Sequence, residues 1–403
     1  ETLDTLKALP EPVAARAYYS AEMWSPDINT LLDNLKASSD GKFTYERIDP
    51  VQNPLVPKND GVDSDATVVL QMGERKELAH FASEQDLVAA MLRLINPEQR
   101  AIYFLTGHGE LDTENPGDTS YTLIKGALQN KNYTVNLLNL SSEGKIPEDA
   151  RAVLVAGPKL PLTAEEAAML ETYLDNGGAL VVMEEPRPLT EYGDSPNPLA
   201  DLLAKWGIAL NNDIILDPGA NPPLLVYSDN QNYAQHPISD KLRGIDQRFF
   251  TASSLKLDNV PQDVEITPLA PTYPNAWGEM DIQSIENNTP AFDEAVDFAG
   301  PLTLAVAAEN YSTSGRLVVF GDAEFAADAL YQQGNGDMLL NAVDWAAEQE
   351  NMISLTPKNN VSRTYSPPGT LGLVSMILVS VCLIPILVLA AGVSSWYSRR
   401  RRG

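Results

Sequence analysis

Cysteine and histidine are scarce in this sequence. Of its 403 residues, one is cysteine and three are histidine. A single thiol excludes a disulfide framework, a thiolate zinc site and a C-x-x-C redox pair within the chain. Cys382 lies in the most apolar stretch, where a cysteine nucleophile is not expected. His80, His108 and His236 occupy three separate segments, so we expect no histidine zinc site and no bound metal.

Positively charged residues are also few. Lysine and arginine together number 28, against 55 aspartates and glutamates, so the net charge is −27. Such a surface repels both phosphate backbones and anionic lipid headgroups. We therefore expect no nucleic-acid partner and no adsorption of the soluble part to a membrane surface.

The signature motifs of several enzyme classes are missing. The sequence contains neither G-x-S-x-G nor G-x-x-x-x-G-K-[ST], so a serine nucleophile of that type and ATP binding in the P-loop manner are not expected. Asp-x-Asp patterns are nearly absent, which leaves a calcium site little support. We predict a protein without catalytic residues and without a cofactor, that is, not an enzyme.

One long hydrophobic run is present. Leu371 to Val393 contains no charged residue. At about 1.5 Å per residue, a run of this length can cross a hydrocarbon core of roughly 30 Å. Trp396 and Tyr397 follow, where an aromatic belt is expected, and four arginines at 399–402 come next. We predict a transmembrane helix over residues 370–397.

The flanks of this predicted helix indicate its orientation. By the positive-inside rule the basic tail, 398–403, is cytoplasmic, and the large acidic part then lies outside the cytoplasm. Residues 351–369 contain three prolines and several polar residues and are interpreted as a linker. Because the chain starts at Glu1, we expect that a signal or a first membrane helix preceded it.

Residues 1–98 are predicted to form a small α/β domain. Ser25-Pro26 and Ser83 are typical helix starts, and the helices alternate with strand-like runs. The order β-α-β-β-β-α is that of a thioredoxin-like domain without the redox cysteines. The strands are predicted at 13–20, 43–48, 66–72 and 76–81.

Residues 99–350 are predicted to form a second α/β domain. Thr163-x-x-Glu166 is a capping box at one of its helix starts. Alternation of strands and helices predicts a parallel, doubly wound sheet, interrupted by a loop-rich insertion at 221–300. The principal strands are predicted at 101–105, 133–140, 152–156, 179–183 and 316–320, and the helices at 119–131, 163–174, 198–206 and 335–348.

Polar residues follow three of these strands. In open α/β sheets, ligands collect beyond the carboxyl ends of strands. If the strands are neighbours, these side chains would converge on one edge and form a pocket for a sugar, a peptide or a cation. The interpretation that we favour over ligand binding is structural, with Gly107-His108-Gly109-Glu110 as a turn that hydrogen-bonds its loop to the following helix. The candidate ligand-binding residues are His108, Glu110, Glu184, Asp322 and Glu324.

A series of short motifs runs along nearly the whole chain. In order and spacing they resemble the auxiliary component of gliding-motility-type (GldG-like) ABC transport systems. The motifs are Tyr103-Phe104-Leu105-Thr106-Gly107-His108-Gly109-Glu110, Ala156-Gly157-Pro158, Leu174-x-x-Gly177-Gly178, Leu203-x-x-Trp206-Gly207-Ile208, His236-Pro237-Ile238, Gly315-Arg316-Leu317-Val318-Val319-Phe320-Gly321-Asp322 with Phe325, and Gly334-Asn335-x-Asp337 with Asn341-x-x-x-Trp345.

This resemblance has implications for the fold. The family's central domain is similar to one shared with an intraflagellar transport protein, and its fold resembles that of class I glutamine amidotransferases. Those enzymes use a cysteine at a strand-to-helix elbow, and the soluble part of this chain has none. The resemblance therefore implies an amidotransferase-like fold without that activity.

Together these observations lead to a functional hypothesis. We expect a membrane-anchored, extracytoplasmic accessory subunit whose C-terminal helix contacts lipid and packs against an ABC permease with its own transmembrane helices. A cytoplasmic ABC ATPase would supply the energy. The alternative is a free-standing receptor for envelope glycan, which exposed aromatic side chains near the pocket would favour. Aromatic residues in predicted loops are Tyr192, Tyr227, Tyr233, Tyr273 and Trp277.

Overall fold

A computed structural model describes residues 2–348, except residues 54, 63, 81, 98, 99 and 333. The predicted linker, transmembrane helix and basic tail lie outside the described residues. Within the described ranges, no helix has the length and apolar character needed to span a membrane.

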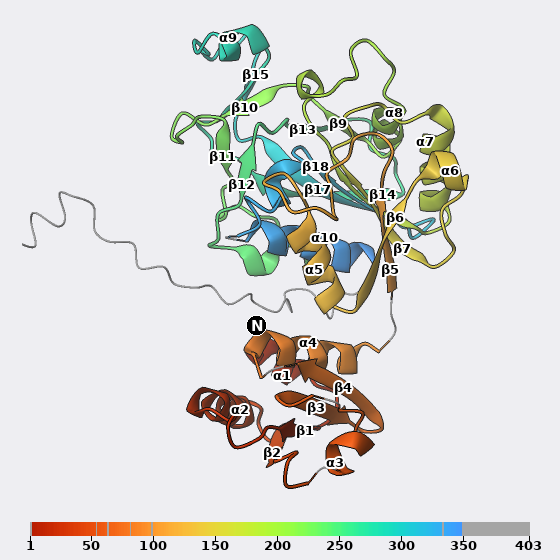
Figure 1. Cartoon of the computed structure of the whole chain (residues 1–403). Helices are drawn as coiled ribbons and strands as arrows, with labels where there is room; N and C mark the ends of the chain where they lie inside the picture. The colour runs from red at the N-terminus through yellow and green to blue at the C-terminus, as the bar shows by residue number, and fades with distance from the viewer. Residues whose placement is uncertain are drawn as a thin grey trace, which may run out of the picture. The chain divides into compact units, whose positions relative to one another are not determined.

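The N-terminal part is a four-stranded sheet in the order β2-β1-β3-β4 (Figure 1). Strand β1 is parallel to β2 and antiparallel to β3, and β3 is antiparallel to β4. The predicted strands and helices are all present, whereas the short helices α1 and α3 were not predicted. The elements are α1 (Thr2–Ala8), β1 (Val13–Tyr18), α2 (Pro26–Ser38), β2 (Phe43–Ile48), α3 (Leu55–Asn59), β3 (Thr67–Met72), β4 (Arg75–His80) and α4 (Glu84–Ile95).

Local signals account for the helix starts in this part. Ser25 accepts a hydrogen bond from the backbone N–H of Ile28, and Ser83 accepts one from that of Asp86, so both serines are N-caps as predicted. The buried faces of α1, α2 and α4 pack with the sheet in one apolar cluster. This cluster gives the N-terminal part a core of its own.

Residues 100–348 contain a nine-stranded sheet in which five strands are parallel. Strands β6, β5, β7, β8 and β18 lie side by side in that order and all run in the same direction. The elements of this parallel part are β5 (Arg100–Leu105), α5 (Thr122–Asn130), β6 (Tyr133–Leu138), α6 (Leu140–Glu143), β7 (Ala150–Ala156), α7 (Ala164–Asp175), β8 (Ala179–Met183), α8 (Pro198–Lys205), β18 (Arg316–Phe320) and α10 (Asn335–Ala346).

The other four strands of this sheet pair antiparallel, so the prediction of a parallel sheet holds for only part of it. Strand β17 (Thr303–Asn310) pairs antiparallel with β18 and also with β14 (Val264–Pro271) and β13 (Leu255–Leu257), and β13 pairs with β9 (Ile208–Leu210). Strand β17 was missed because alanine, a poor strand former, occupies three of its central positions. Its burial between neighbouring strands outweighs that propensity.

The segment between β10 and β16 carries smaller elements. Strands β10, β15 and β16 form a three-stranded sheet, and β11 pairs with β12. The predicted loop-rich insertion, 221–300, thus also supplies β13 and β14 to the large sheet. The smaller elements are β10 (Ile214–Leu216), β11 (Leu225–Tyr227), β12 (Arg248–Phe250), β15 (Trp277–Glu279), α9 (Ile282–Glu286) and β16 (Phe298–Ala299).

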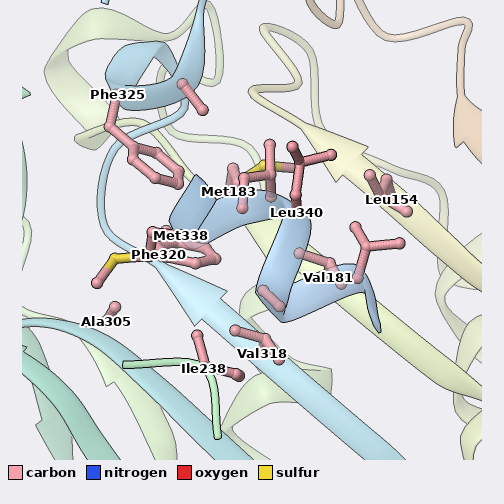
Figure 2. Packing of buried hydrophobic residues seen from close by; sticks show 14 of the residues in the cluster. Leu154, Val181, Met183, Ile238, Ala305, Val318, Phe320, Phe325, Met338 and Leu340 are labelled. Carbon is pink, nitrogen blue, oxygen red and sulfur yellow. The ribbon is translucent and has the colours of Figure 1, made fainter. Parts of the chain in front are cut away.

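Both faces of the large sheet are covered by helices. Along β8, Val181 and Met183 belong to a core shared with α5 and α10, whereas Leu180 and Val182 belong to a core shared with α7 and α8. Figure 2 shows the first of these cores around α10, with Phe320 of β18 close to α10 and Phe325. Because side chains alternate between the two faces along a strand, residues just beyond a strand end also lie on one face of the sheet or the other.

Candidate functional site

The Gly107-to-Glu110 turn lies where the strand order of the sheet reverses. From β5 the chain passes to β6 on one side, and β7 then pairs with the other side of β5. In doubly wound sheets, the crevice beyond the carboxyl ends of two such strands is the usual ligand site. The turn therefore lies at the position where doubly wound sheets usually bind a ligand.

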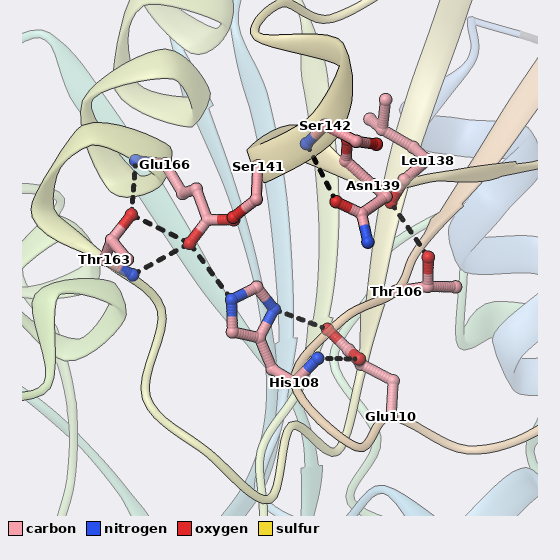
Figure 3. A network of polar contacts seen from close by, with 9 residues as sticks. All are labelled: Thr106, His108, Glu110, Leu138, Asn139, Ser141, Ser142, Thr163 and Glu166. Atoms are coloured by element: carbon pink, nitrogen blue, oxygen red, sulfur yellow. Dashed lines mark hydrogen bonds and ion pairs between the residues drawn. The ribbon is translucent and has the colours of Figure 1, made fainter.

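His108 bridges two glutamates at this position (Figure 3). Its Nδ1 lies 3.2 Å from Glu110 Oε1, and its Nε2 lies 3.0 Å from Glu166 Oε2 at the start of α7. The backbone N–H of His108 also donates to Glu110 Oε2 at 2.8 Å. The His108 side chain is 10% exposed, and both of its ring nitrogens take part in this nearly buried network.

Glu166 serves both the helix and the histidine. Thr163 and Glu166 form the predicted capping box at the start of α7, and Ser141 of α6 donates to the same carboxylate at 2.7 Å. Burial raises the pKa of the Glu166 carboxyl, but the hydrogen bonds from Thr163 and Ser141 outweigh it and leave the pKa below its ordinary value. The carboxylate is thus held ionised opposite His108.

Backbone contacts close the crevice beside the histidine. Lys159 and Leu160, after β7, both donate their N–H groups to the carbonyl oxygen of His108 at 2.8 Å. Gly109 has φ +80°, and a Cβ placed there would lie 3.1 Å from the side chain of Lys159. Glycine is required here both for the positive φ and for the close approach of the two loops.

The network around His108 is consistent with the structural interpretation of the turn. It connects the loop after β5 to α6, α7 and the loop after β7. Sequence patterns indicated Glu110 and the capping box separately, but no local signal indicated that Glu166 is the second partner of His108. That pairing spans 58 positions and depends on how α7 packs.

Glu184 lies at the same edge of the sheet, at the end of β8, and lines a cavity of about 100 Å³. Burial, followed by the charge of Glu185, raises the pKa of Glu184 to about 8. Tyr192, which is also buried, lines this cavity. Burial and then the charges of Glu184 and Glu110 raise the pKa of the Tyr192 hydroxyl.

Asp322 and Glu324 belong to a second group of carboxyl groups. Asp322 is fully buried and accepts hydrogen bonds from the backbone N–H groups of Phe250, Glu324 and Phe325. Burial and the charge of Glu185 raise the pKa of Asp322 well above its ordinary value. Asp322 therefore organises the loop after β18 and its contact with β12.

The five predicted residues thus share one edge of the sheet but do not form one pocket. His108 and Glu110 are bonded to each other, and Glu184 lines a cavity nearby. Asp322 and Glu324 instead interact with Glu185: beyond the effect of burial, the charges of Glu185 and Glu324 raise the pKa of Asp322, and the charge of Glu324 raises the pKa of Glu185. Their role in ligand binding stays a prediction. Among the described residues, no group of three or more His, Cys, Asp or Glu side chains is arranged to hold a metal ion.

Other motifs from the sequence also meet in space. The His236 ring lies edge-on to Trp345 of α10, with ring centroids 5.0 Å apart, and Asn341 donates to the carbonyl oxygen of Ile238 at 3.1 Å. Asn335, at the start of α10, exchanges hydrogen bonds with the backbone of Arg248. These motifs anchor loops to α10.

A comparison with protein families identifies the chain. Residues 99–342 match the model of a family described as an ABC-type uncharacterized transport system, ABC_transp_aux. This stretch is more than half of the 403 residues. The chain belongs to this family. It is therefore an auxiliary component of an ABC-type transport system, which implies association with ABC transporter partners.

Solved structures of other proteins resemble part of the chain. The "mmIFT52 N-terminal domain" is 20% identical, covers 61% of this chain and 97% of its own, and has a TM-score of 0.44. A putative ThuA-like protein from Bacteroides uniformis ATCC 8492 is 16% identical, covers 62% and 91%, and has a TM-score of 0.37. At these identities and TM-scores, neither assigns a function. No curated protein matches the chain.

Proposed function

We propose that this chain is a non-catalytic, membrane-anchored accessory subunit of an ABC transporter, with its α/β domains outside the cytoplasm. The observation that carries the proposal is the family match over residues 99–342. In this proposal the hydrophobic run Leu371 to Val393 is the anchor, and the gliding-motility type is the expected subtype. A permease with transmembrane helices and a cytoplasmic ATPase are the expected partners.

The arrangement around His108 supports a structural role for this turn and not a catalytic one. A catalytic base needs free reach to a substrate, whereas both ring nitrogens of His108 already face carboxylates. The carbonyl oxygen of His108 is likewise occupied by two N–H groups from the loop after β7. A rigid loop cluster of this kind is suited to presenting a surface to a partner protein.

The strand orders support the proposed fold types. Four strands in the order β2-β1-β3-β4, with β3 antiparallel to its neighbours, suit a thioredoxin-like domain. The parallel order β6-β5-β7-β8-β18, with helices on both faces, suits an amidotransferase-like domain. Neither domain would carry out the chemistry of those families, because the only cysteine is Cys382.

In the proposed mechanism the soluble domains bias the conformational states of the permease. A subunit that binds one permease state more tightly than another shifts the balance between them without a chemical step. The ATPase then supplies the energy for the cycle. The large negative charge of the chain, −27, would favour partner surfaces of positive charge.

The alternative of a free-standing glycan receptor has less support. Sugar stacking needs exposed aromatic faces, and the aromatic residues proposed for it are buried or half-buried. Tyr192 and Tyr233 are 2% and 3% exposed. Tyr227, Tyr273 and Trp277 are half-buried.

Copurification tests the proposal. The full-length protein is tagged, extracted from its native membrane in a mild detergent and analysed by quantitative mass spectrometry. We expect an ABC permease and an ABC ATPase in near-stoichiometric amounts. The control is the same tag on an unrelated single-pass membrane protein. Recovery of this chain without either partner, at a yield that detects other native complexes, would contradict the proposal.

A further inference from the structure

The cavity beside Glu184 is distinct from the His108 network. It lies beyond the end of β8, between the segment 187–197, helix α8 and strand β9. Glu184 and Tyr192, each 2% exposed, lie in its interior. Arg187 is half-buried and Asn212 is exposed, so these two lie toward the mouth.

Three residues that line this cavity each have a buried polar atom without a hydrogen-bond partner among the described residues. These atoms are Glu184 Oε1, Glu185 Oε1 and the Tyr192 hydroxyl oxygen. Leaving such a group unsatisfied is unfavourable, and buried polar groups without partners are rare in native proteins. A carboxyl and a hydroxyl beside one cavity therefore indicate a bound polar group.

The charges around the cavity indicate the sign of that group. Burial raises the pKa of Glu185, and the positive charge of Lys159 acts against that increase. The guanidinium of Arg187 donates hydrogen bonds to the carbonyl oxygens of Gly193 and Ser195. Among the described residues, the charge that acts on Glu184 is the negative charge of Glu185, whereas the positive charge of Arg187 acts on Tyr192. A ligand with positive charge and N–H donors complements this arrangement.

The size of the cavity limits what can enter it. A volume of about 100 Å³ exceeds the roughly 10–15 Å³ that one water requires, but it is below the roughly 300–1,000 Å³ of pockets that enclose a whole small molecule. The cavity therefore suits the end group of a larger ligand. The remainder of that ligand would leave past Asn212.

We propose that this cavity binds the protonated primary amine at the end of a larger molecule. The ammonium group pairs with the Glu184 carboxylate and donates a further hydrogen bond to the Tyr192 oxygen. An amino sugar, a lysine side chain and an ethanolamine headgroup all present this group. The assignment goes beyond the transporter role and does not depend on which partner binds, so amine binding and copurification can fail separately.

Calorimetry on the full-length protein in detergent tests the site with a matched pair of small probes. Ethanolamine carries an ammonium group, and ethylene glycol has the same size without the charge. We expect ethanolamine to bind at least about tenfold more tightly than ethylene glycol, as one charge-assisted hydrogen bond would give. Because ionised Glu184 is needed, binding at pH 7 should release a proton, seen as a dependence of the heat on the buffer.

Three variants locate the binding. Glu184→Gln keeps the shape and removes the charge, and we expect about a tenfold or greater loss of ethanolamine affinity. Tyr192→Phe should give a smaller loss. Glu191→Gln, which removes an exposed carboxylate from the same segment, should leave the affinity unchanged. Melting temperatures establish that each variant is folded.

Several outcomes would overturn the proposal. They are equal binding of ethylene glycol, undiminished binding to Glu184→Gln, and no heat from ethanolamine with folded protein, in which case the cavity holds water only. If Glu184→Gln fails to fold, Tyr192→Phe and proton release by the unmodified protein decide instead. Glucosamine, Nα-acetyl-lysine and glycerophosphoethanolamine then distinguish an amino sugar, a peptide and a lipid headgroup as the source of the amine.

Discussion

At the scale of single residues, His108 joins groups that reach it from three directions. Glu110 approaches from its own loop, Glu166 from the start of α7, and the N–H groups after β7 from the neighbouring strand. Loss of such a buried network leaves polar atoms unpaired and separates loops that glycines allow to approach closely. We therefore predict that the histidine is important mainly for stability.

Replacing both His108 and Glu110 by alanine should lower the free energy of unfolding by roughly 2–4 kcal/mol. Urea denaturation followed by circular dichroism measures this change. Glu114→Ala serves as the control, because Glu114 is exposed and its ion pair with Lys125 lies at the surface. An unchanged unfolding midpoint in the double variant, with loss of a bound ligand, would instead favour a binding role for the turn.

Glu184 should make stability depend on pH. Its pKa is raised to about 8 from an ordinary value of 4.5, so the folded state holds a proton that the unfolded state has lost between these values. The stabilisation that the protonated carboxyl provides is therefore fully present below about pH 4.5, and it is lost as the pH rises to about 8. At about 1.4 kcal/mol per pH unit, the decrease is roughly 5 kcal/mol.

The difference between Glu184→Gln and the unmodified protein isolates this effect from other titrating groups. Glutamine cannot ionise. We therefore expect the free energy of unfolding of the variant, relative to that of the unmodified protein, to increase from pH 5 to pH 8. Denaturation series at several pH values measure the increase. A difference that stays constant over this range would show that Glu184 ionises normally in the folded state.

At the scale of elements, α7 shows how one helix start serves a wider cluster. The Thr163 hydroxyl accepts from the Glu166 N–H, and the Glu166 carboxylate accepts from the Thr163 N–H and also meets His108. Capping by itself contributes about 1 kcal/mol. In this helix the same carboxylate also fixes the loop after β5.

Thr163→Ala should therefore destabilise the protein by more than an isolated cap would, by roughly 1.5–2.5 kcal/mol. Thr163→Ser retains the hydroxyl and should lose little. Thr172→Ala, an exposed position in the same helix, is the matched control. Thermal unfolding of the three variants measures the ranking, and equal stability of Thr163→Ala and Thr172→Ala would contradict it.

At the scale of the whole molecule, the proposed orientation across the membrane can be tested with cysteine labelling. Cys382 is the only cysteine, so Cys382→Ala provides a background without thiols. In this background Ser312→Cys, at an exposed position after β17, should react with a membrane-impermeant maleimide in intact cells. Arg402→Cys should react only after permeabilisation. The reverse pattern would contradict the proposed extracytoplasmic location.

Much of the local structure was predictable from the sequence because its signals lie in adjacent residues. The strands at 43–48, 179–183 and 316–320 were predicted with the bounds observed. The capping box of α7 was likewise predicted, since a cap needs only four consecutive residues. The edge of the sheet where polar residues gather also followed from the order of strands and helices.

The tertiary structure decided which of these residues meet. Strand β17 exists because burial among its neighbours outweighs the low strand propensity of alanine, and it makes part of the sheet antiparallel. Packing of α7 against the sheet brings Glu166 to His108, and the alternation of the two faces separates Glu184 from Asp322. Local patterns select elements, whereas long-range packing selects the partners of each polar side chain, because those partners lie far apart along the chain.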